Sequence, residues 1–187
     1  MKSPNEPPSS VRSLTRRQSL KGAMLALGGI ATVSATAWAA ADDGIIRNAE
    51  AIHQEPVFAA SPKRIYDALT DAKQFQKVQL FSGAAKATDV VSKPAQISDQ
   101  PGGSFFLFGG YITGRQLELV SGKRIVQAWH SGSWAADIYS IAKFDLVAQD
   151  KGTKIVFDHT GFPAGQAEHL ASGWKDNYWD ALAQYLK

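Results

Sequence analysis

The spacing of apolar residues predicts how the second part of the chain folds. Hydrophobic and polar residues alternate over residues 51–58, which predicts a first strand. Ser61 and Pro62 then supply a capping side chain and a first helical residue, and the apolar residues beyond them recur three and four apart. This pattern predicts a helix over residues 62–70 with one buried face, followed by a second short helix over residues 71–78.

A series of closely spaced strands is predicted after a turn at residues 101–103, where a proline precedes two glycines. Residues 81–92 are rich in Ala, Gly and Thr without a clear period, so we expect a loop or a weak strand there. The predicted strands cover residues 104–108, 111–120, 124–131, 138–147 and 153–160. Because the connections are short and hairpin-like, successive strands must run antiparallel.

The end of the chain has the pattern of a long amphipathic helix, predicted from residue 166 to residue 186. Apolar and aromatic residues form one stripe along it: Leu170, Trp174, Tyr178, Ala181, Leu182 and Tyr185. A strand, two short helices, an antiparallel sheet and a long C-terminal helix predict an α+β fold. Curving the sheet around the last helix buries both the inner sheet face and the aromatic stripe.

The start of the chain resembles a twin-arginine export signal. Arg16 and Arg17 follow a hydroxyl residue and precede an apolar residue and Lys21, in the order that this signal requires. Ser19 departs from the pattern, since Phe is usual at that position. The resemblance implies recognition by the twin-arginine export machinery and transfer to the periplasm.

The segment behind the arginines has the features of a removable leader. Residues 22–41 carry no charge but are diluted by small and hydroxyl residues, and a small-x-small pattern predicts cleavage after Ala39 or Ala41. We therefore expect a signal peptide over residues 1–41, a folded domain over residues 45–187 and no stable membrane span after cleavage. An uncleaved anchor, or a cytoplasmic protein with a chance match, is the alternative.

The charge balance changes when the leader is set aside. The chain of 187 residues has a formal net charge of +3, but the leader holds five of its 20 basic residues and one of its 17 acidic residues. The remaining domain has 15 basic and 16 acidic residues. Such a near-neutral surface gives no reason to expect nucleic acid as a partner. The absence of cysteine excludes disulfides, thiolate nucleophiles and thiolate metal sites.

An ordered series of motifs identifies a family resemblance. The motifs are PGGSF at 101–105, GGYITG at 109–114, LELVSGKRIVQAW at 117–129, GTKIVFDHTGFP at 152–163, and Gly173-Trp174 ahead of Tyr178-Trp179. They resemble the bacterial relatives of the activator of the ninety-kilodalton heat-shock protein ATPase, within the START-like helix-grip (SRPBCC) superfamily. The resemblance covers residues 52–186 and implies a curved antiparallel sheet that grips a long C-terminal helix.

The resemblance implies more than one function. Members of the superfamily typically hold an apolar molecule in the cavity between sheet and helix, and some are enzymes such as cyclases or lyases. Eukaryotic members of the family instead bind the chaperone and stimulate its ATPase. That chaperone and its ATP are cytoplasmic, whereas the leader directs export, so the sequence favours the ligand-binding interpretation.

Ten residues are candidates for lining such a cavity, because large aromatic side chains on the strands and the last helix suit a small apolar ligand. They are Phe106, Phe108, Tyr111, Trp129, Trp134, Tyr139, Phe157, His159, Trp174 and Tyr178. For any one of them, ordinary core packing is the alternative. His159 is in phase with apolar neighbours and should point inward, either as a hydrogen-bonded core histidine or toward a ligand.

The remaining residues give no sign of a catalytic, cofactor or metal site. The four histidines lack metal-ligand spacing, and the glycine pairs lie between strands instead of before a helix. No acid and base pair is identifiable. The leading hypothesis is therefore an exported, non-enzymatic module that binds a small hydrophobic or aromatic molecule. The alternatives are a co-chaperone or protein-interaction module and a cyclase- or lyase-like enzyme with His159 as its first candidate.

Overall fold

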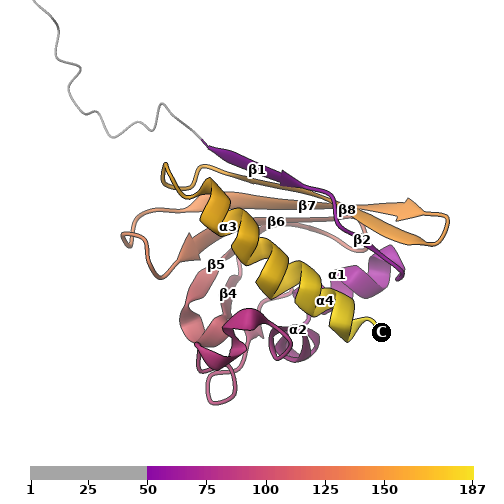
Figure 1. Cartoon of the computed structure of the whole chain (residues 1–187), viewed down its shortest axis with the longest axis horizontal. Helices are drawn as coiled ribbons and strands as arrows, with labels where there is room; N and C mark the ends of the chain where they lie inside the picture. The colour runs from indigo at the N-terminus through magenta and orange to yellow at the C-terminus, as the bar shows by residue number, and fades with distance from the viewer. Residues whose placement is uncertain (1–49) are drawn as a thin grey trace, which may run out of the picture. The chain divides into compact units, whose positions relative to one another are not determined.

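One antiparallel sheet and one long helix dominate the part of the chain that the structure describes, residues 50–187 (Figure 1). The structure is a computed structural model. It confirms the α+β helix-grip fold expected from the sequence. The leader expected over residues 1–41 lies outside the described residues, so its cleavage and its role in export stay predictions.

The elements agree closely with the predicted ranges. The strands are β1 (Ala51–Gln54), β2 (Val57–Phe58), β3 (Gln96–Ile97), β4 (Ser104–Leu107), β5 (Ile112–Val120), β6 (Arg124–Ser131), β7 (Ser140–Gln149) and β8 (Gly152–Thr160). The helices are α1 (Pro62–Thr70), α2 (Ala72–Gln79), α3 (Ala167–Trp174) and α4 (Asp180–Tyr185). Short helical turns occur at η1 (Gly83–Lys86) and η2 (Phe108–Gly110), and a π-helical turn, η3 (Lys175–Trp179), joins α3 to α4.

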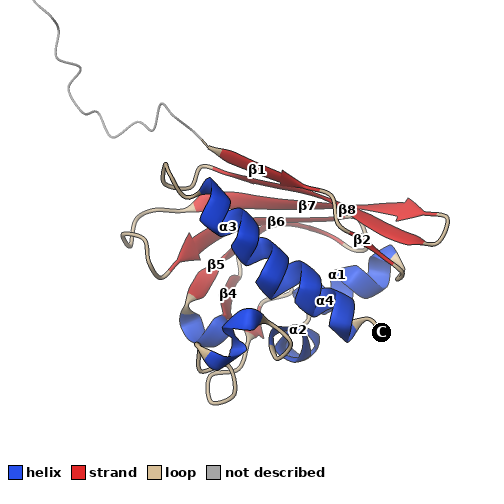
Figure 2. Cartoon of the chain, in the orientation of Figure 1, coloured by secondary structure: helices blue, strands red, loops and turns tan. Residues whose placement is uncertain are grey.

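The strands form one sheet in the order β1-β8-β7-β6-β5-β4-β3, and β2 also pairs with β8. Every pairing is antiparallel. The sheet bends around the C-terminal helix, which crosses its inner face (Figure 2). α2 packs against α4, and α1 packs against β7. α2 therefore holds one end of the long helix in place, and α1 joins α2 to the sheet.

One predicted strand is broken in the structure, while residues 81–92, predicted as a loop or a weak strand, form a loop. The strand expected over residues 51–58 is broken between β1 and β2, because Pro56 has no N–H for the ladder; its carbonyl still accepts a bond from Ile155 N–H at 2.9 Å. Residues 81–92 contain the turn η1 and no strand. Ala, Gly and Thr there satisfy their backbone groups locally, as in the bond from Thr88 N–H to the Ala84 carbonyl.

The first two helices begin at the caps that the sequence supplies. The Ser61 hydroxyl accepts from Arg64 N–H, and Pro62 occupies the first helical position. Asp71 ends α1 and at once caps α2, because its carboxylate accepts from Gln74 N–H at 2.9 Å. One residue thus ends the first helix through its backbone and begins the second through its side chain.

The inner face of the sheet is apolar and aromatic. On β7 and β8 alternate residues are buried, and the rings of Phe144 and Phe157 lie 4.9 Å apart beneath the helix. Trp174 and Trp179 cover them from the helix, with ring centroids 4.4 and 5.2 Å from that of Phe157. The centre of the sheet and the middle of the helix are therefore close-packed.

The C-terminal helix is interrupted by a π turn, which the sequence pattern does not predict. Asp180 N–H donates to the Lys175 carbonyl, five residues back in the chain. The wider turn lets the adjacent side chains Tyr178 and Trp179 both be buried against the sheet. An unbroken α-helix separates neighbouring residues by about 100°, so it would leave one of these two rings further from the sheet.

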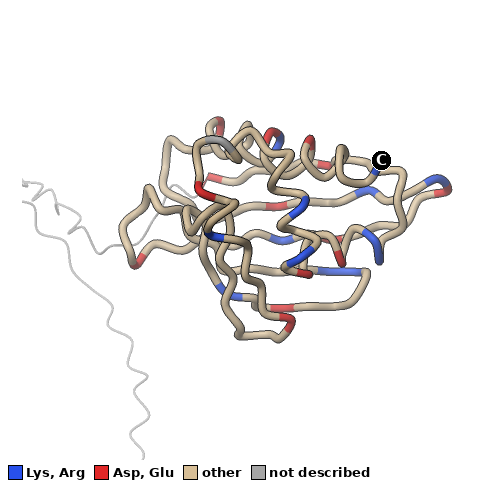
Figure 3. The backbone as a smooth tube through the Cα atoms, turned by 90° about the horizontal axis from the view of Figure 1, so that it is seen from below, with Lys and Arg blue, Asp and Glu red and all other residues tan. Residues whose placement is uncertain are grey.

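Charged residues of both signs are interspersed over the structure (Figure 3). On the outer sheet face, Asp158 on β8 contacts His53 on β1 at 2.7 Å and Lys143 on β7 at 2.9 Å. Arg124 on β6 pairs in the same way with Asp145 on β7. The ion pairs thus link four neighbouring strands.

None of the helices between residues 50 and 187 combines the length and the apolar character that a membrane crossing needs.

We predict that Gly114→Ala destabilises the domain. Gly114 on β5 lies beneath the ring of Phe105, and a Cβ there would lie 2.1 Å from the Ala128 carbonyl oxygen and 2.4 Å from that ring. Since backbone on β6 cannot move aside, the free energy of unfolding should fall by about 2 kcal/mol. Urea denaturation followed by tryptophan fluorescence measures this change.

Gly173→Ala is the matched control for this substitution. A Cβ at Gly173 meets no atom within 4 Å, and the residue lies inside α3. Alanine there should raise the free energy of unfolding by about 0.5–1 kcal/mol through its better helix propensity. Equal stability of the two variants would contradict the claim that the Ala128 carbonyl and the Phe105 ring leave no room for a side chain at Gly114.

Candidate functional site

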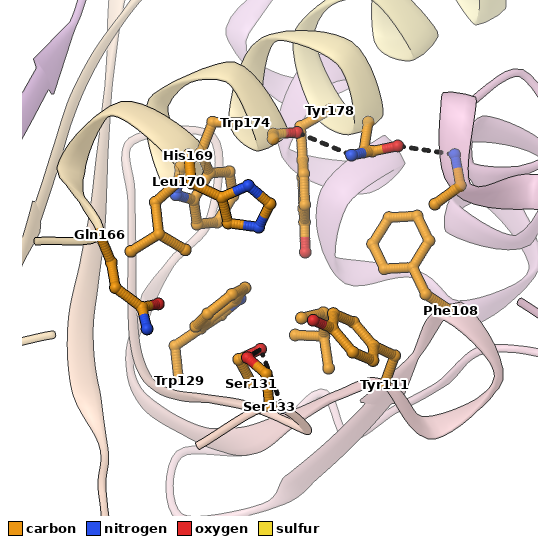
Figure 4. Close-up of a pocket in the computed structure, with 14 residues that line it drawn as sticks. Phe108, Tyr111, Trp129, Ser131, Ser133, Gln166, His169, Leu170, Trp174 and Tyr178 are labelled. Atoms are coloured by element: carbon orange, nitrogen blue, oxygen red, sulfur yellow. Dashed lines mark hydrogen bonds between the residues drawn. The ribbon is translucent and has the colours of Figure 1, made fainter. Parts of the chain in front are cut away.

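A pocket of about 210 Å³ lies between one end of the sheet and the C-terminal helix. Aromatic and aliphatic side chains make most of its wall: Phe108, Tyr111, Ile112, Trp129, Leu170, Trp174 and Tyr178. Smaller or polar residues complete it: Ala84, Ser131, Ser133, Gln166, His169, Gly173 and Asn177. Figure 4 shows Tyr178 extending from the helix into the pocket. An apolar wall with a few polar groups is typical of a small-molecule site.

Five of the ten predicted residues meet at this pocket. They come from η2 and the residue after it, from the end of β6 and from the C-terminal helix: Phe108, Tyr111, Trp129, Trp174 and Tyr178. The ring of Tyr178 lies 4.2 Å from that of Trp174 and 5.5 Å from that of Phe108. Elements distant in sequence therefore bring these rings together, but whether they hold a ligand stays a prediction.

The expectation that all ten residues line the cavity does not hold for five of them, and two of these five lie away from the pocket. Phe106 on β4 alternates with the buried Phe105 and Leu107, so it points to the opposite face, where its ring lies over Gly110. Tyr139, in the β6–β7 loop, is 51% exposed and contacts His130. Phe106 was misplaced because it is one residue out of phase with the buried residues of its strand, and Tyr139 because it lies in a loop.

Three further predicted residues lie behind the pocket wall. The ring of Phe157 is fully buried in the packed centre of the sheet. Trp134 packs on Trp129 at 5.4 Å, and its indole Nε1–H donates to Gln166 at 2.9 Å. It therefore supports a wall residue and fixes Gln166, without itself lining the pocket.

His159 lies at the base of the same wall, fully buried and bonded on both sides of its ring. Trp174 Nε1–H donates to His159 Nδ1 at 2.9 Å, so a neutral ring carries its proton on Nε2. That nitrogen lies 2.6 Å from Ser140 Oγ, and the Ser140 hydroxyl donates to the Trp129 carbonyl at 3.1 Å. Of the two possibilities that the sequence left open, His159 is therefore the hydrogen-bonded core histidine. Both ring nitrogens are engaged within the protein, so neither is left to act on a ligand.

Burial sets the protonation state of His159. Loss of solvation in this apolar site lowers the pKa of the imidazole to about 4. Protonation would also put a hydrogen on Nδ1, which could then no longer accept the hydrogen bond from the Trp174 indole N–H. The ring is therefore neutral at ordinary pH, and its hydrogen bonds hold Trp174 in place at the pocket.

The mouth of the pocket carries hydroxyl groups. Ser131 Oγ lies 2.9 Å from Ser133 Oγ, and both adjoin the Tyr111 hydroxyl, whose pKa the two serines lower. Tyr111 and Ser133 are exposed, as is His169 on the helix side. A ligand entering here would pass polar side chains before it reached the aromatic interior.

The turn that carries Phe108 is held in an unusual backbone conformation. Phe108 has φ of 50°, and Gly109 and Gly110 follow with φ of 66° and 96°. A left-handed conformation is unfavourable for a phenylalanine, at a cost of about 1–2 kcal/mol. The buried Gln79 of α2 stabilises the turn, since its side-chain oxygen accepts from Phe108 N–H at 3.1 Å. This is what directs the Phe108 ring into the pocket.

Asn177 joins the π turn to the opposite wall. Its amide donates to the Gly173 carbonyl at 3.0 Å, and its oxygen accepts from Ala84 N–H in η1 at 2.8 Å (Figure 4). Asn177, Gly173 and Gln166 were not predicted to line a cavity, and Leu170 was predicted only as part of the apolar stripe of the helix. The spacing of the four residues, four, three and four apart, places them along one flank of the helix, and this signal identifies them in retrospect.

Two polar atoms on the pocket wall have no hydrogen-bond partner. They are the indole Nε1 of Trp129 and the hydroxyl of Tyr178, in side chains only 4% and 5% exposed. Burial raises the pKa of the Tyr178 hydroxyl, and the nearby Trp129 N–H opposes this effect without forming a hydrogen bond of good geometry. A buried polar group without a partner costs about 1–3 kcal/mol.

The polar groups of the pocket wall are hydroxyls, amides, indole N–H groups and one imidazole. Among residues 50–187, no three His, Asp or Glu side chains group as metal ligands do. None of the described residues that line the pocket is Lys, Arg, Asp or Glu. What the arrangement can do is enclose a small, mostly apolar molecule and offer it hydrogen-bond donors.

A curved antiparallel sheet that grips a long helix, with a pocket between the two, defines the helix-grip class of proteins. The sequence model of the family described as "Activator of Hsp90 ATPase homolog 1-like protein" matches residues 59–187. The chain belongs to this family.

Characterised relatives share this domain within longer chains. The chain is 24% identical over 137 residues to the activator of 90 kDa heat shock protein ATPase homolog 2 of Mus musculus, covering 73% of this chain and 38% of that protein. It is 26% identical over 127 residues to homolog 1 of Homo sapiens, covering 68% and 34%. The chain therefore spans just over a third of the length of these relatives.

Solved structures show the same fold at low identity. An HSP90 activator from Plasmodium falciparum matches with a TM-score of 0.59 at 23% identity, covering 68% of this chain and 89% of that one. The Aha1 dimer from Colwellia psychrerythraea matches with a TM-score of 0.58 at 18% identity, covering 73% and 96%.

We predict that His159 makes the domain less stable in mild acid. The pKa is lowered from 6.5 to about 4 on folding, so the unfolded chain binds the proton that the folded domain excludes. Stability present above pH 6.5 should be lost as the pH falls toward 4, by up to about 3 kcal/mol. Urea denaturation at intervals between pH 7 and pH 4 measures it.

Two variants separate this effect from others in the same pH range. His159→Gln removes the titrating group, so its free energy of unfolding should depend less on pH. His53 acts in the opposite direction, because the hydrogen bond to Asp158 raises its pKa and favours the folded state at low pH. His53→Gln should therefore steepen the acid loss. If the free energy of unfolding depends on pH in the same way in the wild type and in His159→Gln, the acid loss of stability is not due to His159.

Proposed function

We propose that this chain is an exported helix-grip protein that binds a small hydrophobic or aromatic molecule between its sheet and its C-terminal helix. The observation that carries the proposal is the pocket of about 210 Å³ with five aromatic side chains on its wall. The close-packed Phe144–Phe157–Trp174–Trp179 cluster lies beside it, so the pocket is a local departure from an otherwise filled interior.

The side chains around the pocket support binding more than they support a reaction. Trp174 is fixed by His159, Trp129 by Trp134, and Phe108 by the Gln79 contact to its backbone. Rigid aromatic walls lower the entropy cost of ordering side chains around a ligand. The enzyme alternative had His159 as its first candidate, and that ring is fully engaged behind the wall.

A second candidate function is stimulation of a ninety-kilodalton heat-shock protein. It is favoured by the family to which the chain belongs and by the names of its relatives. The chain corresponds to only part of those proteins. The leader-like sequence at residues 1–41 also argues for a compartment without that chaperone. Location in the cell therefore discriminates between the two functions.

Filling the pocket should abolish binding of small aromatic probes. Gly173 lies on the pocket wall, and a Cβ there meets no atom within 4 Å, so the side chain of Gly173→Leu should occupy the cavity. Naphthalene should quench Trp129 and Trp174 fluorescence in the domain over residues 45–187, and the variant should weaken this binding at least tenfold. Fluorescence titration measures both.

Ser172→Leu is the matched control, because Ser172 is the exposed neighbour of Gly173 on the same helix. It adds the same side chain outside the pocket and should leave naphthalene binding unchanged. If naphthalene and similar probes do not bind the wild type, or bind Gly173→Leu equally well, the pocket is not a ligand site.

Export should depend on the arginine pair. Replacing Arg16 and Arg17 with lysine removes the feature that the twin-arginine machinery recognises. In a bacterial host that has this machinery, the full chain should yield a shortened form in the periplasm, and the double variant should remain full-length in the cytoplasm. Cell fractionation and mass spectrometry measure location and length. A wild-type protein retained in the cytoplasm would refute export and favour the chaperone-related candidate.

A further inference from the structure

The pocket wall holds two polar atoms that the protein itself leaves unused. Trp129 Nε1 and the Tyr178 hydroxyl lack hydrogen-bond partners, although both side chains are almost fully buried. Buried polar groups in folded proteins are nearly always paired. Both residues line the pocket, so a molecule bound there is the natural source of the missing partner.

Counting hydrogens shows what kind of partner is missing. An indole N–H only donates, and a phenol donates one hydrogen and also accepts. If the Trp129 hydrogen turns to the Tyr178 oxygen, the phenol hydrogen remains free; if it does not, two hydrogens remain free. In either case the pair needs an acceptor atom.

Several other polar groups of the pocket are paired within the protein, whereas His169 and the Tyr111 hydroxyl lie at its exposed mouth. Ser131 and Ser133 bond to each other, Gln166 accepts from Trp134, and Asn177 is engaged by Gly173 and Ala84. No Lys or Arg lines the described pocket to neutralise an anion, and no Asp or Glu lines it to neutralise a cation. Burying an unpaired ionic group there is unfavourable, so the partner should be neutral.

Two segments with unusual backbone conformations place their side chains near the Tyr178 hydroxyl. Tyr178 lies within the π turn η3, and the ring that faces it at 5.5 Å belongs to Phe108, whose φ is 50°. π turns and strained residues occur frequently at functional sites. Here both act to place side chains around the Tyr178 hydroxyl.

We infer that the ligand is a neutral, mostly apolar molecule with a carbonyl-type oxygen that accepts hydrogen bonds from Tyr178 and Trp129. This inference rests on the proposed function, and it specifies the ligand class for the same pocket. A carbonyl oxygen has two lone pairs and can accept both hydrogens at once. The aromatic rings then enclose the hydrocarbon part of the molecule.

The test compares two probes of similar shape, 1-indanone and indane, which differ by one carbonyl group. Binding to the wild-type domain and to Tyr178→Phe is measured by fluorescence titration and calorimetry. The wild type should bind 1-indanone about 3- to 10-fold more tightly than indane, as one or two additional hydrogen bonds imply. Tyr178→Phe should lose most of this preference and leave the affinity for indane within about twofold.

Tyr185→Phe is the matched control. Tyr185 lies on α4, and its hydroxyl donates to Gln74 at 3.1 Å instead of lining the pocket. Removing that hydroxyl should leave the preference for 1-indanone unchanged. Because the Tyr178 hydroxyl has no protein partner, Tyr178→Phe should fold with a melting temperature at least as high as that of the wild type.

The outcomes separate this inference from the function on which it rests. If both probes bind equally and Tyr178→Phe changes neither, the acceptor inference is wrong while the binding function stands. If neither probe binds the wild type, both are wrong. A preference for 1-indanone that survives Tyr178→Phe and is lost in Trp129→Phe would overturn the role assigned to Tyr178.

Discussion

The contact of Trp174 with the sheet is the interaction on which the rest of the structure depends. Its ring packs on Phe157 at 4.4 Å, and its indole N–H bonds to His159, which is anchored through Ser140 to the backbone of β6. This single side chain therefore fixes the height and rotation of the C-terminal helix over the sheet. Since one side of the same indole lines the pocket, the dimensions of the pocket follow from the contact that stabilises the fold. Stability and the candidate site are thus not independent in this domain.

The pocket exists because the helix and one end of the sheet depart from regular geometry. The π turn places Tyr178 and Trp179 side by side, and Asn177 bonds to the Gly173 carbonyl at that turn while also bonding to η1. Across the pocket, the left-handed Phe108 is stabilised by Gln79 from α2. Close packing resumes at Phe144 and Phe157, where both elements are regular. A cavity maintained by specific hydrogen bonds is more consistent with a binding function than a void left by poor packing.

Much of the fold followed from the sequence, and much less of the site did. Alternation along β4 to β8, the caps at Ser61 and Asp71, and the aromatic stripe of the last helix are local signals, and the elements they predicted agree with the structure within two residues. Phe106 and Tyr139 were misplaced because composition does not show which face of a strand or loop a ring occupies. The π turn and the positive φ of Phe108 could not be predicted, since both arise from tertiary contacts. Asn177 and Gln79 act through long-range hydrogen bonds that no spacing pattern reveals.

The strand order has a consequence for solubility. The sheet begins with the four-residue strand β1 and ends with the two-residue strand β3, so the long strands β6 to β8 lie between neighbours, as does the first half of β5. Free N–H and C=O groups at a sheet edge are templates on which a second chain can add a strand, and very short edge strands limit that addition. A protein arranged in this way presents little backbone for intermolecular β-pairing, which favours a folded chain that stays monodisperse in a crowded compartment.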